Sequence, residues 1–187
     1  MLLCVAIAFN FSGFFLYVAA APAIIYDLLG LSELHFPVIF VPGIAGVMVG
    51  AALSSRMAGR ASRPRTVGIG YVIMFGAAAA NVGYHALYPA ALPWTVIPYA
   101  VYAVGMALAA PSVQLMVLDL FPESSGTASS LQGFTHAIFT SITAGLIASF
   151  IAGSGLTLAL GQIALLTMGI VCWLSCRRLE SRSVAHA

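Results

Sequence analysis

The polar side chains with the clearest chemical potential lie in residues 126–143, which otherwise form an apolar stretch. Small or polar residues recur there at spacings of four, three, four and three: Ser129, Gly133, His136, Thr140 and Thr143. This spacing puts them on one face of a helix. Because the other faces are as apolar as lipid, we expect this face to contact protein or a water-filled cavity inside a membrane. It predicts hydrogen bonding, either to a neighbouring helix or to a solute.

His136 is the residue of this face with the widest chemistry. Because burial disfavours the charged form of an imidazole, we expect a neutral ring that both donates and accepts hydrogen bonds. We interpret His136 first as a bridge between helices and second as a contact to a solute. For Gln132, one turn earlier, a bond across helices and a role in a cavity are equally open.

Two other stretches also carry polar or aromatic side chains at membrane depth. Asn10, Phe14 and Tyr17 are spaced by four and three residues, so they share one helix face. For Asn10, a hydrogen bond between helices is again an equally open interpretation. The other stretch is the fourth apolar run, which offers Tyr99, Tyr102, Met106 and Gln114. The predicted solute-binding set combines all three stretches: Asn10, Phe14, Tyr17, Tyr102, Met106, Gln114, Gln132 and His136.

Bond-making catalysis is not expected. The sequence has no arrangement of a nucleophile and a base, no phosphate loop and no cofactor fingerprint. The three cysteines, Cys4, Cys172 and Cys176, do not suggest a metal site, so neither a metal nor a cofactor is predicted. An intramembrane enzyme remains an alternative because Ser129, Ser130 and His136 occur in the fifth predicted span, although packing explains their stripe better.

The composition indicates a membrane protein. Of 187 residues, 61% are hydrophobic and 6% are charged, whereas soluble domains carry roughly 25% charged residues. Apolar runs of about 20 residues, enough to cross a bilayer as a helix, predict an all-α polytopic protein. The six predicted spans cover about residues 2–25, 36–55, 66–88, 94–118, 127–152 and 156–175. Asn81, Tyr84 and His85 near the end of the third span are interpreted as anchors at the membrane surface.

The placement of arginine predicts the orientation. The chain has no lysine, and its seven arginines form two groups that follow the second and sixth spans: Arg56, Arg60, Arg63 and Arg65, then Arg177, Arg178 and Arg182. Because arginine concentrates on the cytoplasmic side, both termini are expected to be cytoplasmic. The arginines flank apolar spans, so they predict contact with the lipid bilayer and not with nucleic acid. On the same side, Asp119 is predicted to form a latch with Arg56 or Arg60.

Three segments carry a resemblance to a known family. Residues 111–134 (PSVQLMVLDLFPESSGTASSLQGF), 11–36 (FSGFFLYVAAAPAIIYDLLGLSELHF) and 50–60 (GAALSSRMAGR) are similar to the major facilitator superfamily. Within it, the chain most resembles the bicyclomycin-resistance type of drug:proton antiporters. Two positions depart from the family pattern: Ser54 and Ser55 replace an acidic residue, and Ser125 replaces an arginine.

The resemblance implies the C-terminal six-helix half of a twelve-helix carrier in the bacterial inner membrane. The first and fourth spans would line the cavity, the second and fifth would contact the other half, and the third and sixth would face lipid. The implied function is proton-coupled export of a small apolar or weakly basic solute. The implied partner is an N-terminal six-helix half or a second copy of this chain. The alternative is a non-transporting fragment, or a small membrane partner protein that packs against another helical half.

The acidic residues bear on energy coupling. All five lie in predicted loops, turns or the tail: Asp27, Glu33, Asp119, Glu123 and Glu180. Proton-driven carriers place a titratable group at membrane depth, and a neutral histidine without a carboxylate partner is a poor proton carrier. By the resemblance, that carboxylate would lie in the other half. We therefore expect this chain alone to move no protons.

Overall fold

Six helices long and apolar enough to cross a membrane make up most of the chain. The computed structural model describes the backbone of residues 2–120 and 122–185, and the side chains of residues 2–120 and 123–178. The elements are α1 (Leu2–Ala19), α2 (Ala21–Ala23), η1 (Ile24–Leu28), η2 (Glu33–His35), α3 (Pro37–Met57), α4 (Arg63–Leu87), α5 (Ile97–Asp119), η3 (Pro122–Ser124), α6 (Ser125–Ile142), η4 (Thr143–Ile147), α7 (Ala148–Ile151) and α8 (Gly155–Ala185). The predicted all-α class with six spans is confirmed, and the chain is a multi-pass membrane protein.

Proline and glycine set the ends of several spans. A proline lies in the first turn of α3, α4 and α5, where the missing backbone N–H has no partner within the helix to lose. After α3, Gly59 adopts a positive φ of 75°, which lets the chain reverse into α4. A five-residue π-helical segment, η1, follows α2 beyond the first span, and another, η4, lies within the fifth.

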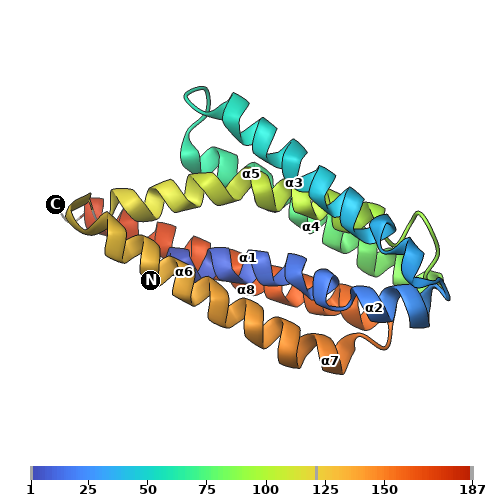
Figure 1. Ribbon diagram of the computed structural model, residues 1–187. Helices are drawn as coiled ribbons and strands as arrows, with labels where there is room; N and C mark the ends of the chain where they lie inside the picture. The colour runs from blue at the N-terminus through green and yellow to red at the C-terminus, as the bar shows by residue number, and fades with distance from the viewer. Residues whose placement is uncertain (1, 121, 186–187) are drawn as a thin grey trace.

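The helices form two groups that are related by an internal repeat. The most extensive pairings are α4 with α5, α3 with α5, α1 with α8, α4 with α8, α1 with α6, and α1 with α5. The first three spans correspond in order to the last three: α1 to α5, α3 to α6, and α4 to α8. If each helix in the list of pairings is replaced by its counterpart, the same list of pairings results. Because α1 and α5 run in opposite directions (Figure 1), the repeat is inverted. An Ala-Ala-Pro sequence follows α1 at residues 20–22, and another lies within α5 at residues 109–111.

Small residues allow α3 to approach α5 closely. A Cβ atom added at Gly46 would lie 2.3 Å from the carbonyl oxygen of Ala100. At Gly50 it would lie 2.3 Å from the carbonyl oxygen of Val104. Backbone contact of this kind stabilises helix pairs in lipid, where no hydrophobic effect drives helices together.

Burial differs sharply between the spans. An apolar 18-residue stretch within each span shows the difference. In the central spans α1 and α5, 56% and 50% of this stretch is buried, whereas the value is 22% for the span that contains α3 and 11% for the span α6–α7. The exposed face of α6–α7 carries large side chains such as Phe134 and Phe150. The second and fifth spans are therefore the least covered by the rest of the chain.

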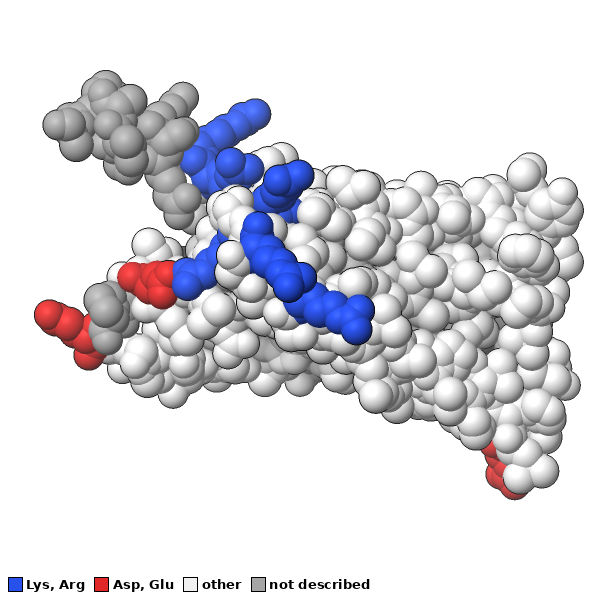
Figure 2. Space-filling view, turned by 90° about the horizontal axis from the view of Figure 1, so that it is seen from above, with Lys and Arg blue, Asp and Glu red and all other residues white. Residues whose placement is uncertain are grey.

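The described arginines gather toward one end of the bundle, which we call the arginine end. Figure 2 shows the basic side chains along this end of one face and none toward the opposite end. The end of α3, the α3–α4 turn, the start of α4 and the end of α8 supply them. Acidic side chains lie at both ends, and the side chains of Glu180 and Arg182 fall outside the described residues.

Candidate functional site

A cavity of about 300 Å³ lies between α1, α5 and α6. Its lining side chains come from all three helices: Ile7, Phe11, Ala110, Pro111, Gln114, Ser129, Gln132, Gly133 and His136. Gln132 lies seven residues after the start of α6, which at 1.5 Å per residue is roughly 10 Å along the helix. The cavity therefore lies within the spans, in the half of the bundle nearer the arginine end.

Two buried polar atoms at this cavity have no partner among the described residues. They are Oε1 of Gln132, whose side chain is only 9% exposed, and Nε2 of His136. The His136 ring packs edge to face against Phe11, with ring centroids 4.6 Å apart. Because buried polar groups are normally hydrogen-bonded, the cavity offers unsatisfied polar atoms beside an aromatic surface.

Three residues of the predicted solute-binding set meet at this cavity, namely Gln114, Gln132 and His136. Ser129, which was assigned to the polar face of this helix, also lines it. Phe11 was not among the predicted residues, although it lies one helical turn before Phe14. That relationship to the predicted face of α1 could have identified it.

Asn10 lies inside the bundle and bridges helices. Its Nδ2 donates a hydrogen bond of 2.9 Å to the hydroxyl of Tyr71, and its backbone carbonyl oxygen accepts one of 3.0 Å from the hydroxyl of Tyr102. Tyr102 and Met106 are also buried, so these three side chains do not reach the cavity. For Asn10, the structure favours the bridging interpretation because the amide ties α1 to α4.

Tyr17 belongs to a second buried polar network. Its hydroxyl accepts a hydrogen bond from Nδ2 of Asn81, which also donates to Oε1 of Gln162. The aromatic ring of Tyr17 stacks on that of Tyr99, and Phe14 stacks on the same ring with centroids 5.1 Å apart. Tyr17 and Phe14 therefore pack inside the bundle and do not line the cavity.

The interpretation of Asn81 as a surface anchor is wrong. Its side chain is fully buried, and it hydrogen-bonds both Tyr17 and Gln162. The physical reason is that α4 packs against α8, which turns Asn81 toward other protein groups. An amide in a bundle gains more from such partners than from the membrane surface.

The partner expected for Asp119 in the predicted cytoplasmic latch is wrong. Asp119 forms its ion pair with Arg63, and not with Arg56 or Arg60. Arg63 is the first residue of α4, which packs along α5, and Asp119 is the last residue of α5. Arg56 instead lies in the last turn of α3 and Arg60 in the α3–α4 turn, so the geometry of α4 and α5 selects Arg63.

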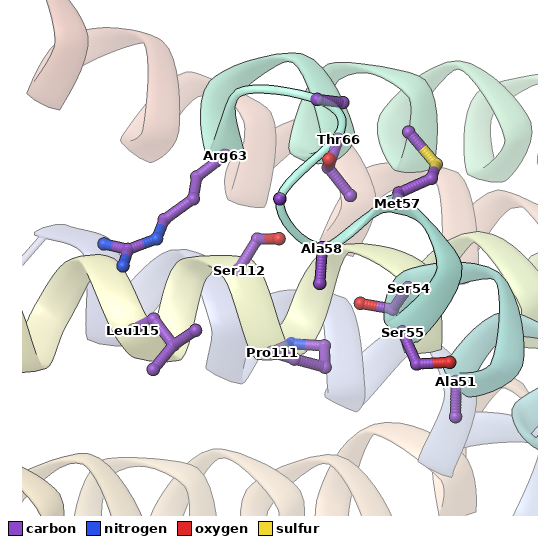
Figure 3. Close-up of a pocket in the computed structure, with 12 residues that line it drawn as sticks. Ala51, Ser54, Ser55, Met57, Ala58, Arg63, Thr66, Pro111, Ser112 and Leu115 are labelled. Carbon is purple, nitrogen blue, oxygen red and sulfur yellow. The ribbon is translucent and has the colours of Figure 1, made fainter.

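A second cavity, of about 430 Å³, lies beside this ion pair (Figure 3). The end of α3, the turn after it, the start of α4 and the middle of α5 enclose it. Figure 3 shows the hydroxyl groups of Ser54 and Ser112 turned into the space between α3 and α5. Pro111 lines both this cavity and the one that contains Gln132, so α5 separates the two.

Within the part of the chain that the structure describes, no group of three or more His, Cys, Asp or Glu residues could hold a metal ion. The fold and the cavity define a multi-pass helical membrane protein with an inverted internal repeat and a cavity within its spans whose described lining side chains are polar and apolar but include no carboxylate or arginine. Comparisons with known protein families, with curated proteins and with solved structures find no match to this chain.

Proposed function

We propose that this chain is one six-helix half of a secondary transporter of the major facilitator type, which exports a small solute. The observation that carries the proposal is the inverted repeat with a polar cavity beside its two central helices, α1 and α5. Inverted repeats of this kind build many transporter folds, with the substrate site at the interface between repeats.

The uneven burial of the spans supports a partner half. The spans α3 and α6–α7 leave most of their surface uncovered by the chain. These are the second and fifth spans, which the resemblance assigns to the contact with the other half. An N-terminal six-helix half is the proposed occupant of these faces, and a second copy of the chain is the alternative occupant.

The proposed location is the bacterial inner membrane, with the arginine end and both termini in the cytoplasm. The arginines of the α3–α4 turn and of α8 support this orientation because arginine is retained on the cytoplasmic side. The cavity lies nearer the same end. It would therefore collect solute from the cytoplasmic side, as an exporter requires.

The proposed mechanism couples export to protons, and the complete carrier carries out no bond-making chemistry. The side chains that line the cavity include no carboxylate. A proton-carrying carboxylate would come from the partner half, and this chain would supply amide, hydroxyl and imidazole groups to the solute. Proton transfer and solute contact would thus be divided between the two halves.

Resistance of drug-sensitive cells tests the proposal. One strain produces this chain alone, and another produces it joined behind an N-terminal six-helix half of a major-facilitator exporter. We expect resistance only from the joined protein, and we expect Gln132→Leu in that protein to lower it. If the joined protein inserts correctly but gives no resistance, the alternative of a non-transporting membrane partner replaces the proposal.

A further inference from the structure

The described side chains that line the cavity between α1, α5 and α6 include no carboxylate, lysine or arginine. Among them, only the imidazole of His136 can carry a charge. Its polar groups are the amides of Gln114 and Gln132, the hydroxyl of Ser129 and the imidazole of His136. The ion pair nearest to it along α5 belongs to Asp119, five residues beyond Gln114 and outside the cavity lining. A solute in this cavity therefore meets hydrogen-bonding groups and aromatic surface, and no carboxylate or guanidinium.

Desolvation decides which solutes such a cavity accepts. Moving an ion out of water into an apolar site is very costly unless a counter-charge compensates it. Apolar side chains such as Ile7 and Phe11 form much of the wall, and no acid or arginine is available there to pair with an ion. An uncharged molecule avoids this cost altogether.

The unpartnered atoms specify what an uncharged solute gains. Oε1 of Gln132 accepts hydrogen bonds, so it requires an N–H or O–H donor. Nε2 of His136 donates or accepts according to its tautomer. The ring of Phe11 lines the same cavity, packs against His136 and offers an apolar surface to a planar group.

We propose that this cavity binds the uncharged form of a small aromatic amide or a similar molecule, with an N–H donor directed at Gln132. This inference rests on the proposed function because it names the solute class of the same site. The volume of about 300 Å³ lies at the lower end of the range for ligand pockets, which favours a single-ring solute. Weak bases would bind in their neutral form.

Three isosteric probes separate charge from shape. Benzamide is neutral, benzamidinium is a cation and benzoate is an anion, and all three present a planar group on one ring. Ligand-observed NMR with the full chain in nanodiscs measures their dissociation constants. We expect benzamide to bind at least tenfold more tightly than either ion, and a fourth probe, acetophenone, which lacks the donor, to bind three- to tenfold more weakly than benzamide, as expected for one lost hydrogen bond.

Variants assign the binding to the cavity. Gln132→Leu should weaken benzamide by roughly three- to tenfold and leave acetophenone unchanged. Ser130→Ala is the matched control, because Ser130 lies on the same helix but is exposed and bonds to the carbonyl of Gly126. Its dissociation constants should equal those of the parent chain.

Two results would overturn the inference. If benzamidinium or benzoate binds as tightly as benzamide, the cavity does not select the uncharged form, while resistance given by the joined protein would still stand. If none of the four probes binds, or if Gln132→Leu leaves benzamide unchanged, the cavity is not a site for such a solute. Resistance without such selectivity would place the transported solute in another class.

Discussion

Asn81 on α4 donates a hydrogen bond to the hydroxyl of Tyr17 on α1, and both side chains are buried. A second hydrogen bond of 3.3 Å from Asn81 reaches Gln162 on α8. One amide therefore ties together three spans, two of which come from the first half of the inverted repeat and one from the second. The role of Asn81 is therefore structural, and it lies away from the cavity that contains Gln132.

The pair should be energetically coupled. We expect Tyr17→Phe and Asn81→Leu each to destabilise the chain, with a coupling free energy of about 0.6 kcal/mol and at most about 1.7 kcal/mol, as found for hydrogen bonds between membrane helices. Unfolding in mixed detergent micelles, analysed as a double-mutant cycle, measures it. Tyr26→Phe serves as the control partner, because Tyr26 is exposed at 46%. Additive effects of Tyr17→Phe and Asn81→Leu would contradict the bond.

The close approach of α3 to α5 should tolerate no added methyl group. Gly46→Ala would place a Cβ against the carbonyl oxygen of Ala100, so either the helices separate or the backbone shifts. We expect a loss of stability of about 1–3 kcal/mol, typical of overpacking. Gly76→Ala is the matched control, since nothing lies within 4 Å of the new atom. Equal melting temperatures for the two variants would show that the contact is absent.

The ion pair at the arginine end should be weak and specific. The side chains of Arg63 and Asp119 are 44% and 60% exposed, so their interaction is worth about 0–1 kcal/mol. Arg63→Asp and Asp119→Arg should each lower the melting temperature slightly at low salt, and the double swap should restore it. Near 1 M salt, screening should remove the effect.

The arginines that the sequence predicted as partners of Asp119, Arg56 and Arg60, provide the control for the charge swap. Arg56→Asp combined with Asp119→Arg should restore nothing, because Asp119 pairs with Arg63. Rescue by Arg56→Asp, and not by Arg63→Asp, would instead support the latch that the sequence predicted.

The number and type of the spans could be predicted because long apolar runs admit only helices in lipid. Three of the cavity residues could also be predicted, since Gln114, Gln132 and His136 are polar at depth. The partners of Asn10 and Asn81 could not. Which polar face turns inward depends on how α1, α4 and α8 pack together, and helix periodicity does not contain that information.

The choice of Arg63 over Arg56 and Arg60 has a similar origin. All three arginines lie in one short, arginine-rich segment. Which of them reaches Asp119 depends on the residue at which α4 begins and on the register of α4 against α5. Charge patterning alone gives the side of the membrane and not the pair.

The proposed orientation can be measured directly. After the native cysteines are replaced, single cysteines at Glu33 and Arg60 should react with an impermeant thiol reagent from opposite sides of the membrane. Glu33 lies in η2 at the end opposite the arginine end, and Arg60 lies in the α3–α4 turn. In intact cells, only Glu33→Cys should label. Labelling of Arg60→Cys from outside would reverse the proposed topology.

Transport by purified protein in proteoliposomes tests the transporter proposal most directly. The chain alone and the chain joined to an N-terminal six-helix half are reconstituted, and release of a labelled neutral aromatic amide is followed under an imposed pH gradient. We expect gradient-dependent transport by the joined protein, a lower rate in its Gln132→Leu variant at low solute concentration, and none by the chain alone. Gradient-dependent transport by the chain alone, or a correctly inserted joined protein that moves no solute, would contradict the proposal.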